Sequence, residues 1–221
     1  MPRDQHRKEH RMKDKKEKFE YGFYWDCRKK CGQKFGSIRD LPIINGPGEK
    51  ISESYRGGKV LDVGAGKEKP IQKYLNLSGD LYFSLDNDPC GRFDYNSVEE
   101  IPENELFSLI TASQFFEHIT VEDSISLVCG LATHLEKNGH LISTVPNTQH
   151  PVRQRADITH VTNWDYEALY MLYRYANLKV IEIARYSKRH PQGIIEKILA
   201  KYINRIYRID WCDSVLIVGE K

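Results

Sequence analysis

The stretch Val60-Leu61-Asp62-Val63-Gly64-Ala65-Gly66 decides the fold class of this chain. Its first four residues form a short, mostly apolar run, as in strands buried on both faces, and its glycines permit the tight turn that follows. Beyond it, apolar runs alternate with segments of helical periodicity as far as the C-terminus. This alternation predicts an α/β protein with crossover connections, in which helices cover both faces of a mostly parallel sheet.

Seven strands are expected in this sheet, and helices separate most of them. The strands are predicted at 60–63, 81–85, 107–112, 140–145, 179–184 and 214–219, with a weaker one near 92–94. Helices are predicted over 71–77, 121–135, 165–176 and 194–207. The last two strands follow the five-strand core with one long helix between them, so one of them has the freedom to run antiparallel at an edge of the sheet.

The length and composition are those of a globular protein with one domain and a small appendage. The chain has 221 residues, of which 40% are hydrophobic and 29% charged, and this does not fit a disordered, collagen-like or disulfide-stapled chain. No apolar run approaches the roughly 20 residues of a membrane span, and the N-terminus has no apolar signal sequence. The five cysteines, an odd number, indicate reduced thiols, so we expect a cytoplasmic protein.

Charge is distributed unevenly along the chain. Residues 1–18 contain eight Lys or Arg and four Asp or Glu, whereas the whole chain has a net charge of only +2. We expect 1–18 to be a flexible, solvated basic tail; contact with phosphates or an anionic surface is the alternative. Residues 19–56 are rich in aromatic residues and are expected to pack, as a lead-in or partial lid, on a main domain over 57–221. The small net charge does not favour dedicated nucleic-acid binding.

Polar residues gather where the predicted strands end. Ligands of open parallel sheets bind beyond the carboxyl ends of the strands, so these residues are the first candidates for a site. They are Gly64 and Gly66 after the first strand, Asp86, Asn87 and Asp88 after the second, Gln114, Glu117 and His118 after the fourth, and Asn147, Gln149 and His150 after the fifth. We expect all of them to face one crevice, an arrangement that packing alone does not explain.

The glycine turn does not have the pattern of a phosphate-binding loop. A dinucleotide-binding GxGxxG would have its third glycine where this chain has Lys69, which Pro70 follows. Asp86 lies 22 residues beyond Gly64, at the end of the second strand, where a carboxylate can accept hydrogen bonds from both hydroxyls of a ribose. The alternatives are a plain glycine turn and an aspartate that caps a turn or a helix.

These motifs resemble those of class I S-adenosylmethionine-dependent methyltransferases. The resemblance rests first on residues 60–66 and on Leu85-Asp86. Phe116-Glu117-His118-Ile119, Ser143-Thr144-Val145-Pro146-Asn147 and Asp157-Ile158-Thr159-His160-Val161 resemble the type 11/type 23 branch of that family. The resemblance covers about residues 55–187. It implies a Rossmann-like class I methyltransferase fold with a mostly parallel seven-stranded sheet, and S-adenosyl-L-methionine as the cofactor.

The resemblance also implies roles for individual residues. Asp62, Gly64, Ala65 and Gly66 would line the methionine part of the cofactor, Asp86 would bind the ribose, Asn87 and Asp94 would lie beside the adenine, and Gln114 and Phe115 would flank the sulfonium. Two departures from the family pattern stand out. Lys67-Glu68-Lys69 replaces a third small residue, and Phe107-Ser108 replaces the usual Phe-Asp of the fourth strand, but the ribose anchor is retained.

Three histidines are candidates for a catalytic role. Methyl transfer needs the acceptor to be held in line with the methyl group, and an oxygen or nitrogen acceptor also needs a general base. His118, His150 and His160 are the candidate bases, because histidine titrates near neutral pH. Each has a structural alternative: His118 caps its loop, His150 is merely exposed beside Pro151, or His160 ties a loop to the core.

The same region resembles, in part, the metal site of small-RNA 3′-terminal 2′-O-methyltransferases, which hold a divalent metal with two glutamates and two histidines. Glu117, His118 and His160 match three of these ligands, but Gln114 stands where the first glutamate would be, so no metal is expected. Cys27 and Cys31 have no second cysteine pair nearby and are expected to be buried thiols.

The helix predicted over 194–207 carries a basic stripe of Lys197, Lys201, Arg205 and Arg208 beside several isoleucines. An ordinary amphipathic helix packed on the sheet explains this pattern. The alternative is weak peripheral contact of a basic face with lipid headgroups or a polyanionic glycan.

The sequence therefore predicts an S-adenosylmethionine-dependent methyltransferase that transfers a methyl group to an oxygen or nitrogen of a small-molecule or glycan-type acceptor. Residues 147–160 and 19–56 are expected to shape the acceptor pocket. Two alternatives stay open: an RNA 3′-end 2′-O-methyltransferase that uses a divalent metal, and a methyltransferase-like binding subunit without activity. The acceptor itself and the oligomeric state are not predicted.

Overall fold

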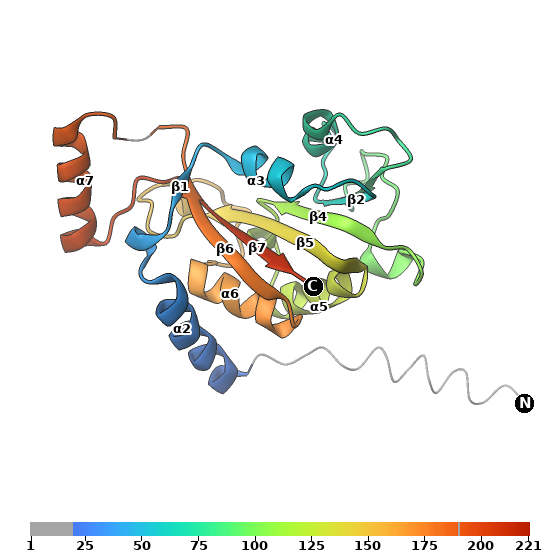
Figure 1. The fold of residues 1–221 in the computed structure, drawn as a ribbon, viewed down its shortest axis with the longest axis horizontal. Coiled ribbons are helices and arrows are strands. Elements are labelled where there is room, and N and C mark those ends of the chain that lie inside the picture. The colour runs from blue at the N-terminus through green and yellow to red at the C-terminus, as the bar shows by residue number, and fades with distance from the viewer. Residues whose placement is uncertain (1–19, 190) are drawn as a thin grey trace, which may run out of the picture.

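A seven-stranded sheet forms the centre of the protein (Figure 1). The computed structural model describes residues 20–189 and 191–221. The strands lie in the order β1-β6-β7-β5-β4-β2-β3, which confirms the α/β, Rossmann-like class. They are β1 (Ile43–Ile44), β2 (Val60–Val63), β3 (Tyr82–Leu85), β4 (Phe107–Ser113), β5 (Leu135–Pro146), β6 (Lys179–Tyr186) and β7 (Ser214–Glu220).

The sheet is parallel except for β7. This strand runs antiparallel to β5 and to β6, whereas every other neighbouring pair is parallel. An antiparallel strand was expected at an edge, and the structure places it inside the sheet instead. The chain returns after α7 into the gap between β5 and β6, where Ile217 finds a partner on each side, in Ser143 and Ile183.

The prediction of a weak strand near residues 92–94 is wrong. The chain there forms a single bridge from Leu85 to Tyr95. The amides of Asp94 and Tyr95 both donate to the carbonyl of Ser84, at 3.1 and 3.0 Å. The pairing with β3 therefore does not extend beyond this one bridge. The seventh strand is β1 at the opposite edge, which pairs in parallel with the end of β6.

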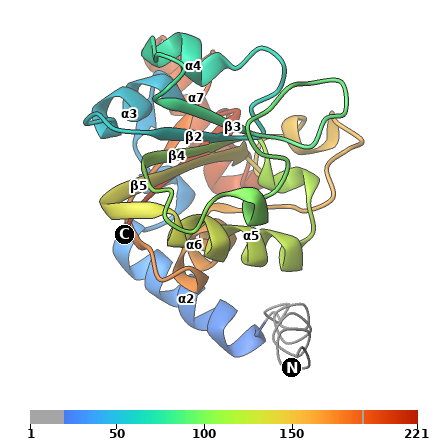
Figure 2. The ribbon, with the colours of Figure 1, turned by 90° about the vertical axis from the view of Figure 1, so that its right-hand side faces the viewer.

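Helices cover both faces of the sheet (Figure 2). On one face lie α3 (Pro47–Ser54) and α4 (Pro70–Leu75); on the other lie α5 (Val121–Thr133) and α6 (Tyr166–Tyr175), with α2 (Tyr21–Phe35) outside α6. Helix α7 (Ile194–Tyr207) follows β6 and stands apart from the sheet (Figure 1). Short 3-10 helices lie at Ile38–Asp40, Val98–Glu100, Phe116–His118 and Arg153–Arg155.

The helix expected over 121–135 ends two residues earlier, at Thr133, and β5 begins at Leu135 rather than at residue 140. Leu135 pairs with Phe107 and His140 with Leu109, so the longer stretch of β5 bulges between these pairs. Asn138, with φ 62°, lies in that bulge instead of ending the helix. The other predicted helices agree with the structure to within two residues at each end.

The core lies on both faces of the sheet, and alternate residues of each central strand belong to opposite faces. Ile110 and Leu141 pack on the side of α5 and α6, whereas their neighbours Leu109 and Ile142 pack with Ile51 of α3. This is the two-residue period of a strand buried on both sides. It fixes the register of β4 and β5, and with it the position of the loops at their carboxyl ends.

The segment before the sheet packs against α6 and the sheet edge. Arg28 of α2 forms ion pairs with Asp165, at 3.0 Å, and with Glu167. Cys31 is fully buried and free, and burial raises its pKa to about 12, as expected of a structural thiol. The division at residues 18 and 56 stays a prediction, and residues 1–18 lie outside the described part of the chain.

None of the helices in residues 20–189 and 191–221 has both the length and the apolar composition that a bilayer span requires.

Candidate functional site

Asp86 points into the glycine turn that follows β2. The Gly66 amide donates to Asp86 Oδ2 at 2.9 Å, and the Asp88 amide donates to Asp86 Oδ1 at 3.0 Å. Gly64 and Gly66 have φ values of 68° and 57°, in the left-handed region that favours glycine. The carboxylate is half-buried, so the end of β3 and the turn after β2 form one corner.

Phe115 closes this corner from the side of β4. A Cβ atom on Gly64 would lie 2.5 Å from Cδ2 of Phe115, so the absence of a side chain at Gly64 is what lets the ring rest on the turn. A cavity of about 260 Å³ opens beside it. Its lining includes Asp86, Asn87, Phe115, Ile119 and Leu127. Three of these residues, Asp86, Asn87 and Phe115, were predicted to bind a cofactor.

Asp62 and Asp94, by contrast, are not among the residues that line the cavity. Asp62 is buried and accepts hydrogen bonds from Tyr82 at 2.9 Å and Thr111 at 2.8 Å. Burial raises the pKa of Asp62 to about 6. Asp94 Oδ2 accepts from both the amide and the hydroxyl of Ser84, at 2.8 and 2.7 Å. Both carboxylates therefore join strands or loops in this structure.

Gln114 is also turned away, toward β5. It adopts a left-handed backbone conformation with φ 52°, and its amide Nε2 donates to Thr144 Oγ1 at 3.1 Å. Gly64, Ala65 and Gly66 do not line the cavity, but Gly64 adjoins it through Phe115 and Gly66 through Asp86. The predicted contacts of these four residues with a cofactor stay predictions.

His118 and His160 lie together at the carboxyl end of β4. Their ring centroids are 5.0 Å apart, in an edge-to-face arrangement. Thr159 Oγ1 lies 3.0 Å from His118 Nδ1 and donates to Asp157 Oδ1 at 2.6 Å, so the hydroxyl oxygen accepts the Nδ1 proton of His118. His160 Nδ1 lies 3.0 Å from the carbonyl of Gln154, which can only accept. Nε2 of His118 is therefore left to take a proton, whereas Nε2 of His160 lies 4.0 Å from Asp157 Oδ2.

Glu117 lies buried beside the two rings. Neither of its carboxylate oxygens has a hydrogen-bond partner among the described residues, and burial raises its pKa to about 7. One ligand atom each of Glu117, His118 and His160 lies within 4.8 Å of the others. The backbone carbonyl of Glu117 accepts from the amides of Val161, at 2.7 Å, and Thr162, at 3.1 Å, which fastens the 157–164 segment to the end of β4.

His150 lies outside this cluster and is committed to its own loop. Its Nδ1 accepts from the amides of Val152, at 3.3 Å, and Arg153, at 3.1 Å, and its Nε2 lies 3.7 Å from Asp213. The structure thus brings two of the three predicted histidines together and sets the third apart. Thr159 and Asp157, which orient His118, had no predicted role, although Asp-x-Thr is a known turn signal that their spacing displays.

A second, larger cavity of about 490 Å³ lies between α2, α6, α7 and the segment after β5. Its lining includes Arg28, Arg39, Gln149, Glu167, Asn204 and Arg205. Side chains from 19–56 and from 147–160, the segments predicted to shape an acceptor pocket, both contribute to its lining, and the acceptor role itself stays a prediction. The lining of the cavity is mainly polar, and half of the lining residues are charged.

Comparison with known proteins identifies the family. The family model Methyltransf_23, described as a methyltransferase domain, matches residues 46–183. The chain belongs to this methyltransferase family. The match confirms the family resemblance and the enzyme class predicted from the sequence, and the methyltransferase domain it marks includes both strand ends of the Asp86 corner. A search of the curated proteins gives no match.

Solved structures similar to this methyltransferase confirm its fold. A SAM-dependent methyltransferase from Archaeoglobus fulgidus is 16% identical, with a TM-score of 0.61 over 91% of this chain and 100% of that one. A SAM-dependent methyltransferase from Mesorhizobium loti is 11% identical, with a TM-score of 0.53 over 78% and 96%. The N-methyltransferase NodS from Bradyrhizobium japonicum is 13% identical, with a TM-score of 0.50 over 79% and 94%.

Proposed function

We propose that this methyltransferase uses S-adenosyl-L-methionine to methylate an oxygen or nitrogen of a polar small-molecule or glycan-type acceptor. The observation that carries the proposal is the Asp86 carboxylate, which contacts the Gly66 amide and lines the 260 Å³ cavity at the carboxyl edge of the sheet. Strand ends at this edge are the usual ligand site of open parallel sheets.

The residues of the corner suit this cofactor. Each oxygen of Asp86 accepts one backbone amide and keeps a second lone pair, so the carboxylate can also accept from the two ribose hydroxyls. Asn87 and the ring of Phe115 line the same cavity and would flank the adenosine. When bound, the cofactor supplies a methyl group on a cationic sulfur. It carries no phosphate, which agrees with a turn that lacks the GxGxxG pattern.

His118 is the favoured general base. Thr159 holds the proton of His118 on Nδ1, and the Asp157 carboxylate behind Thr159 favours the positive charge that the ring acquires. Nε2 of His118 is then free to take the acceptor's proton as the methyl group transfers. His160 supports the ring edge-on and is the second candidate. His150 is a weaker candidate, because its Nδ1 accepts amides of its own loop and its Nε2 lies 3.7 Å from Asp213, which precedes β7.

The 490 Å³ cavity is the proposed acceptor pocket. It is lined by polar and charged side chains, and these suit a hydroxyl-rich or ionic acceptor better than an apolar one. We keep the cytoplasmic location as part of the proposal, and the five free cysteines support it.

Isothermal titration calorimetry with S-adenosylhomocysteine tests the cofactor assignment directly. Saturable binding at one site per chain is expected. Absence of binding by the pure, folded protein would overturn the proposal and leave only the fold. Binding without turnover across a broad panel of acceptors would instead favour a methyltransferase-like binding subunit.

A second candidate function rests on the cluster of Glu117, His118 and His160. A buried carboxylate without a hydrogen-bond partner among the described residues and two imidazoles, with ligand atoms within 4.8 Å of one another, fit a divalent metal such as Zn²⁺ or Mn²⁺. With a metal at this cluster, the partial resemblance to small-RNA 2′-O-methyltransferases implies that the acceptor would be an RNA 3′ end. Gln114 does not complete the set, because its amide donates to Thr144. Chelator-sensitive activity together with salt-sensitive RNA binding would favour this candidate over the first.

A further inference from the structure

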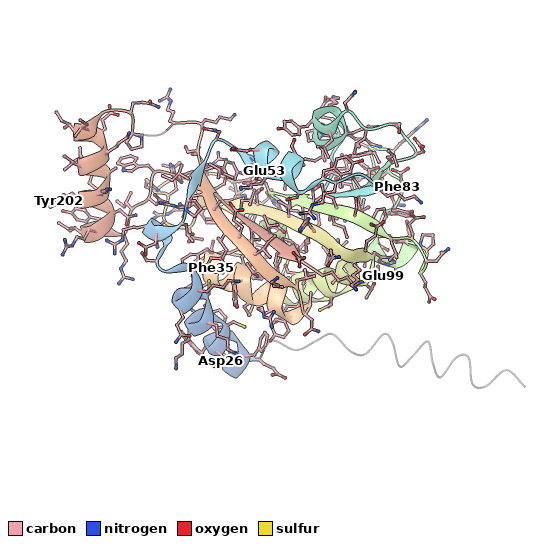
Figure 3. All side chains as sticks on the ribbon, viewed as in Figure 1. Asp26, Phe35, Glu53, Phe83, Glu99 and Tyr202 are labelled. Atoms are coloured by element: carbon pink, nitrogen blue, oxygen red, sulfur yellow. The ribbon has the colours of Figure 1, made fainter. Side chains whose placement is uncertain are left out.

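Helix α7 exposes an apolar face that nothing in the described structure covers. Its large apolar side chains are between half and four-fifths exposed: Ile194 79%, Ile195 81%, Ile198 63%, Leu199 53%, Tyr202 59% and Ile206 51%. Figure 3 shows Tyr202 on the side of α7 that faces away from the sheet. An ordinary amphipathic helix turns its apolar face inward, so the expectation of a helix packed on the sheet by that face is wrong.

The helical period explains how the face points outward. Ile194, Ile198 and Tyr202 follow one another at intervals of four residues, so they form a single line along the helix. Asn204 is the buried residue of α7, and it lies on the side opposite that line. The helix thus buries a polar side chain, whereas four of its five isoleucines are exposed and Ile203 is half-buried.

Positive charge flanks the apolar face. Lys197, Lys201, Arg205 and Arg208 lie along one border of it, all exposed. The single acidic residue of the helix, Glu196, is used at its start, where it accepts from the Gln192 amide at 2.7 Å. The exposed charge beside the apolar face is therefore mainly basic, with four Lys or Arg side chains against the one carboxylate of Glu196. Tyr207 and Trp211, 67% and 42% exposed, follow at the C-terminal end, and these are residue types that favour a membrane–water interface.

We propose that α7 docks on an anionic lipid surface and lies in the plane of its headgroups. Apolar side chains on one face with lysines and arginines beside them are the pattern of an interfacial helix. The basic side chains can extend toward the headgroups while the isoleucines enter the acyl boundary.

Charge disfavours two other partners for the apolar face of α7, namely a second copy of this chain and its own N-terminal residues. A second copy paired through the same face would set two basic borders against each other, and like charges oppose that pairing. Residues 1–19 lie outside the described part of the chain, and their composition is strongly basic and poor in large apolar residues, so they do not complement the face either.

The position of α7 links the proposed membrane contact to the candidate site. It follows the carboxyl end of β6, so it lies at the edge of the sheet where β3 and β4 also end and the candidate site opens. Arg205 belongs both to the basic border and to the lining of the 490 Å³ cavity. A docked α7 would hold that cavity close to membrane-borne acceptors, a consequence that rests on the proposed function.

Vesicle co-sedimentation tests the contact without any cofactor or acceptor. Wild type is expected to bind phosphatidylcholine vesicles that contain roughly one-third phosphatidylglycerol at least about tenfold more tightly than vesicles of phosphatidylcholine alone. The double variant I195E/I198E should lose at least about tenfold in binding to the anionic vesicles, and K197E/K201E should lose the preference for them. All four positions are exposed, so both variants should melt like the wild type.

The matched control is L106E. Leu106 is apolar and 42% exposed, but it precedes β4 and so lies at the opposite end of the sheet; L106E should bind vesicles as the wild type does. Vesicle binding that I195E/I198E leaves unchanged would overturn the proposal. So would a wild type that ignores anionic vesicles, whether it forms a dimer that I195E/I198E dissolves or stays monomeric. Because no step needs S-adenosylhomocysteine, failure here is distinguishable from failure of the cofactor assignment.

Discussion

Thr159 lies within hydrogen-bond distance of His118, with 3.0 Å between the hydroxyl oxygen and Nδ1, and the same hydroxyl donates to Asp157. The three side chains form a row that fixes the tautomer of His118. A turn at 157–159 thereby reaches the end of β4, about 40 residues earlier in the chain.

This row predicts separate effects for two variants. H118A should lower kcat by about 10²-fold or more, as is typical when a general base is removed. T159V keeps the imidazole but removes the acceptor for its Nδ1 proton, so we expect a smaller loss in kcat, a shifted pH profile and an unchanged KM for the cofactor. Steady-state rates between pH 5 and 9 measure both. Full activity of H118A would move the role of base to His160.

Replacement of Asp86 tests the cofactor corner. D86A removes the acceptor for the Gly66 amide and the proposed acceptor for two ribose hydroxyls, so S-adenosylhomocysteine should bind more than about tenfold more weakly. Calorimetry gives the affinity, and a thermal melt of the apo variant separates this loss from unfolding. D80A, which removes an aspartate from the loop before β3, is the control and should bind normally. Equal affinity for D86A and wild type would place the ribose elsewhere.

Two buried carboxyl groups predict how stability depends on pH. Burial raises the pKa of Asp62 from 3.8 to about 6 and that of Glu117 from 4.5 to about 7. The folded state therefore holds protons that the unfolded chain has lost, and the free energy of unfolding should fall as pH rises between about 4 and 7.

Thermal melts at pH 5 and pH 7.5 measure this trend, and the melting temperature should be higher at pH 5. E117Q should flatten the dependence, because an amide in place of the carboxyl has no charge to bury. A melting temperature that rises toward pH 7.5 in the wild type would mean that other groups dominate.

A buried ion pair predicts a large loss of stability. Arg185 donates to Asp210 at 2.9 Å and to the carbonyl of Leu41 at 3.0 Å, and Asn147 donates to the other oxygen of Asp210 at 2.8 Å. R185A leaves the Asp210 carboxylate buried beside a cavity, so we expect a loss of about 3–5 kcal/mol in the free energy of unfolding. Urea titration measures it. The control K73A breaks an exposed pair with Glu68 and should leave the unfolding midpoint nearly unchanged.

The strands around the glycine turn could be predicted because their signal is local. Residues 60–63 and 81–85 are short, mostly apolar runs, and the glycines and Asp86 mark where they end. The same local pattern was enough to predict that Asp86, Asn87 and Phe115 lie at one site, and all three line the same cavity. It could not reveal that Gln114 turns toward Thr144, because that depends on a hydrogen bond across the sheet.

Three other features could not be predicted from the sequence because they depend on contacts with distant residues. The two residues of β1 are too few to display a period, and only the pairing with β6 makes them a strand. For α7, periodicity predicted the helix correctly but not its orientation, since a hydrophobic face indicates burial only if something is there to bury it. Asp62 is a third case: its place in a ligand-binding motif did not reveal that Tyr82 and Thr111 occupy its carboxylate.

The pairing of β1 with β6 has a consequence for how the chain is assembled. Ile43 pairs with Arg185 after about 140 intervening residues, so β1 cannot take its place in the sheet before β6 has been synthesised. Until the two strands pair, one edge of β6 has unpaired backbone amides and carbonyls, to which another strand could bind. β1 therefore stays without its partner strand for most of the synthesis of the chain, and it covers the free edge of β6 once that strand has been made.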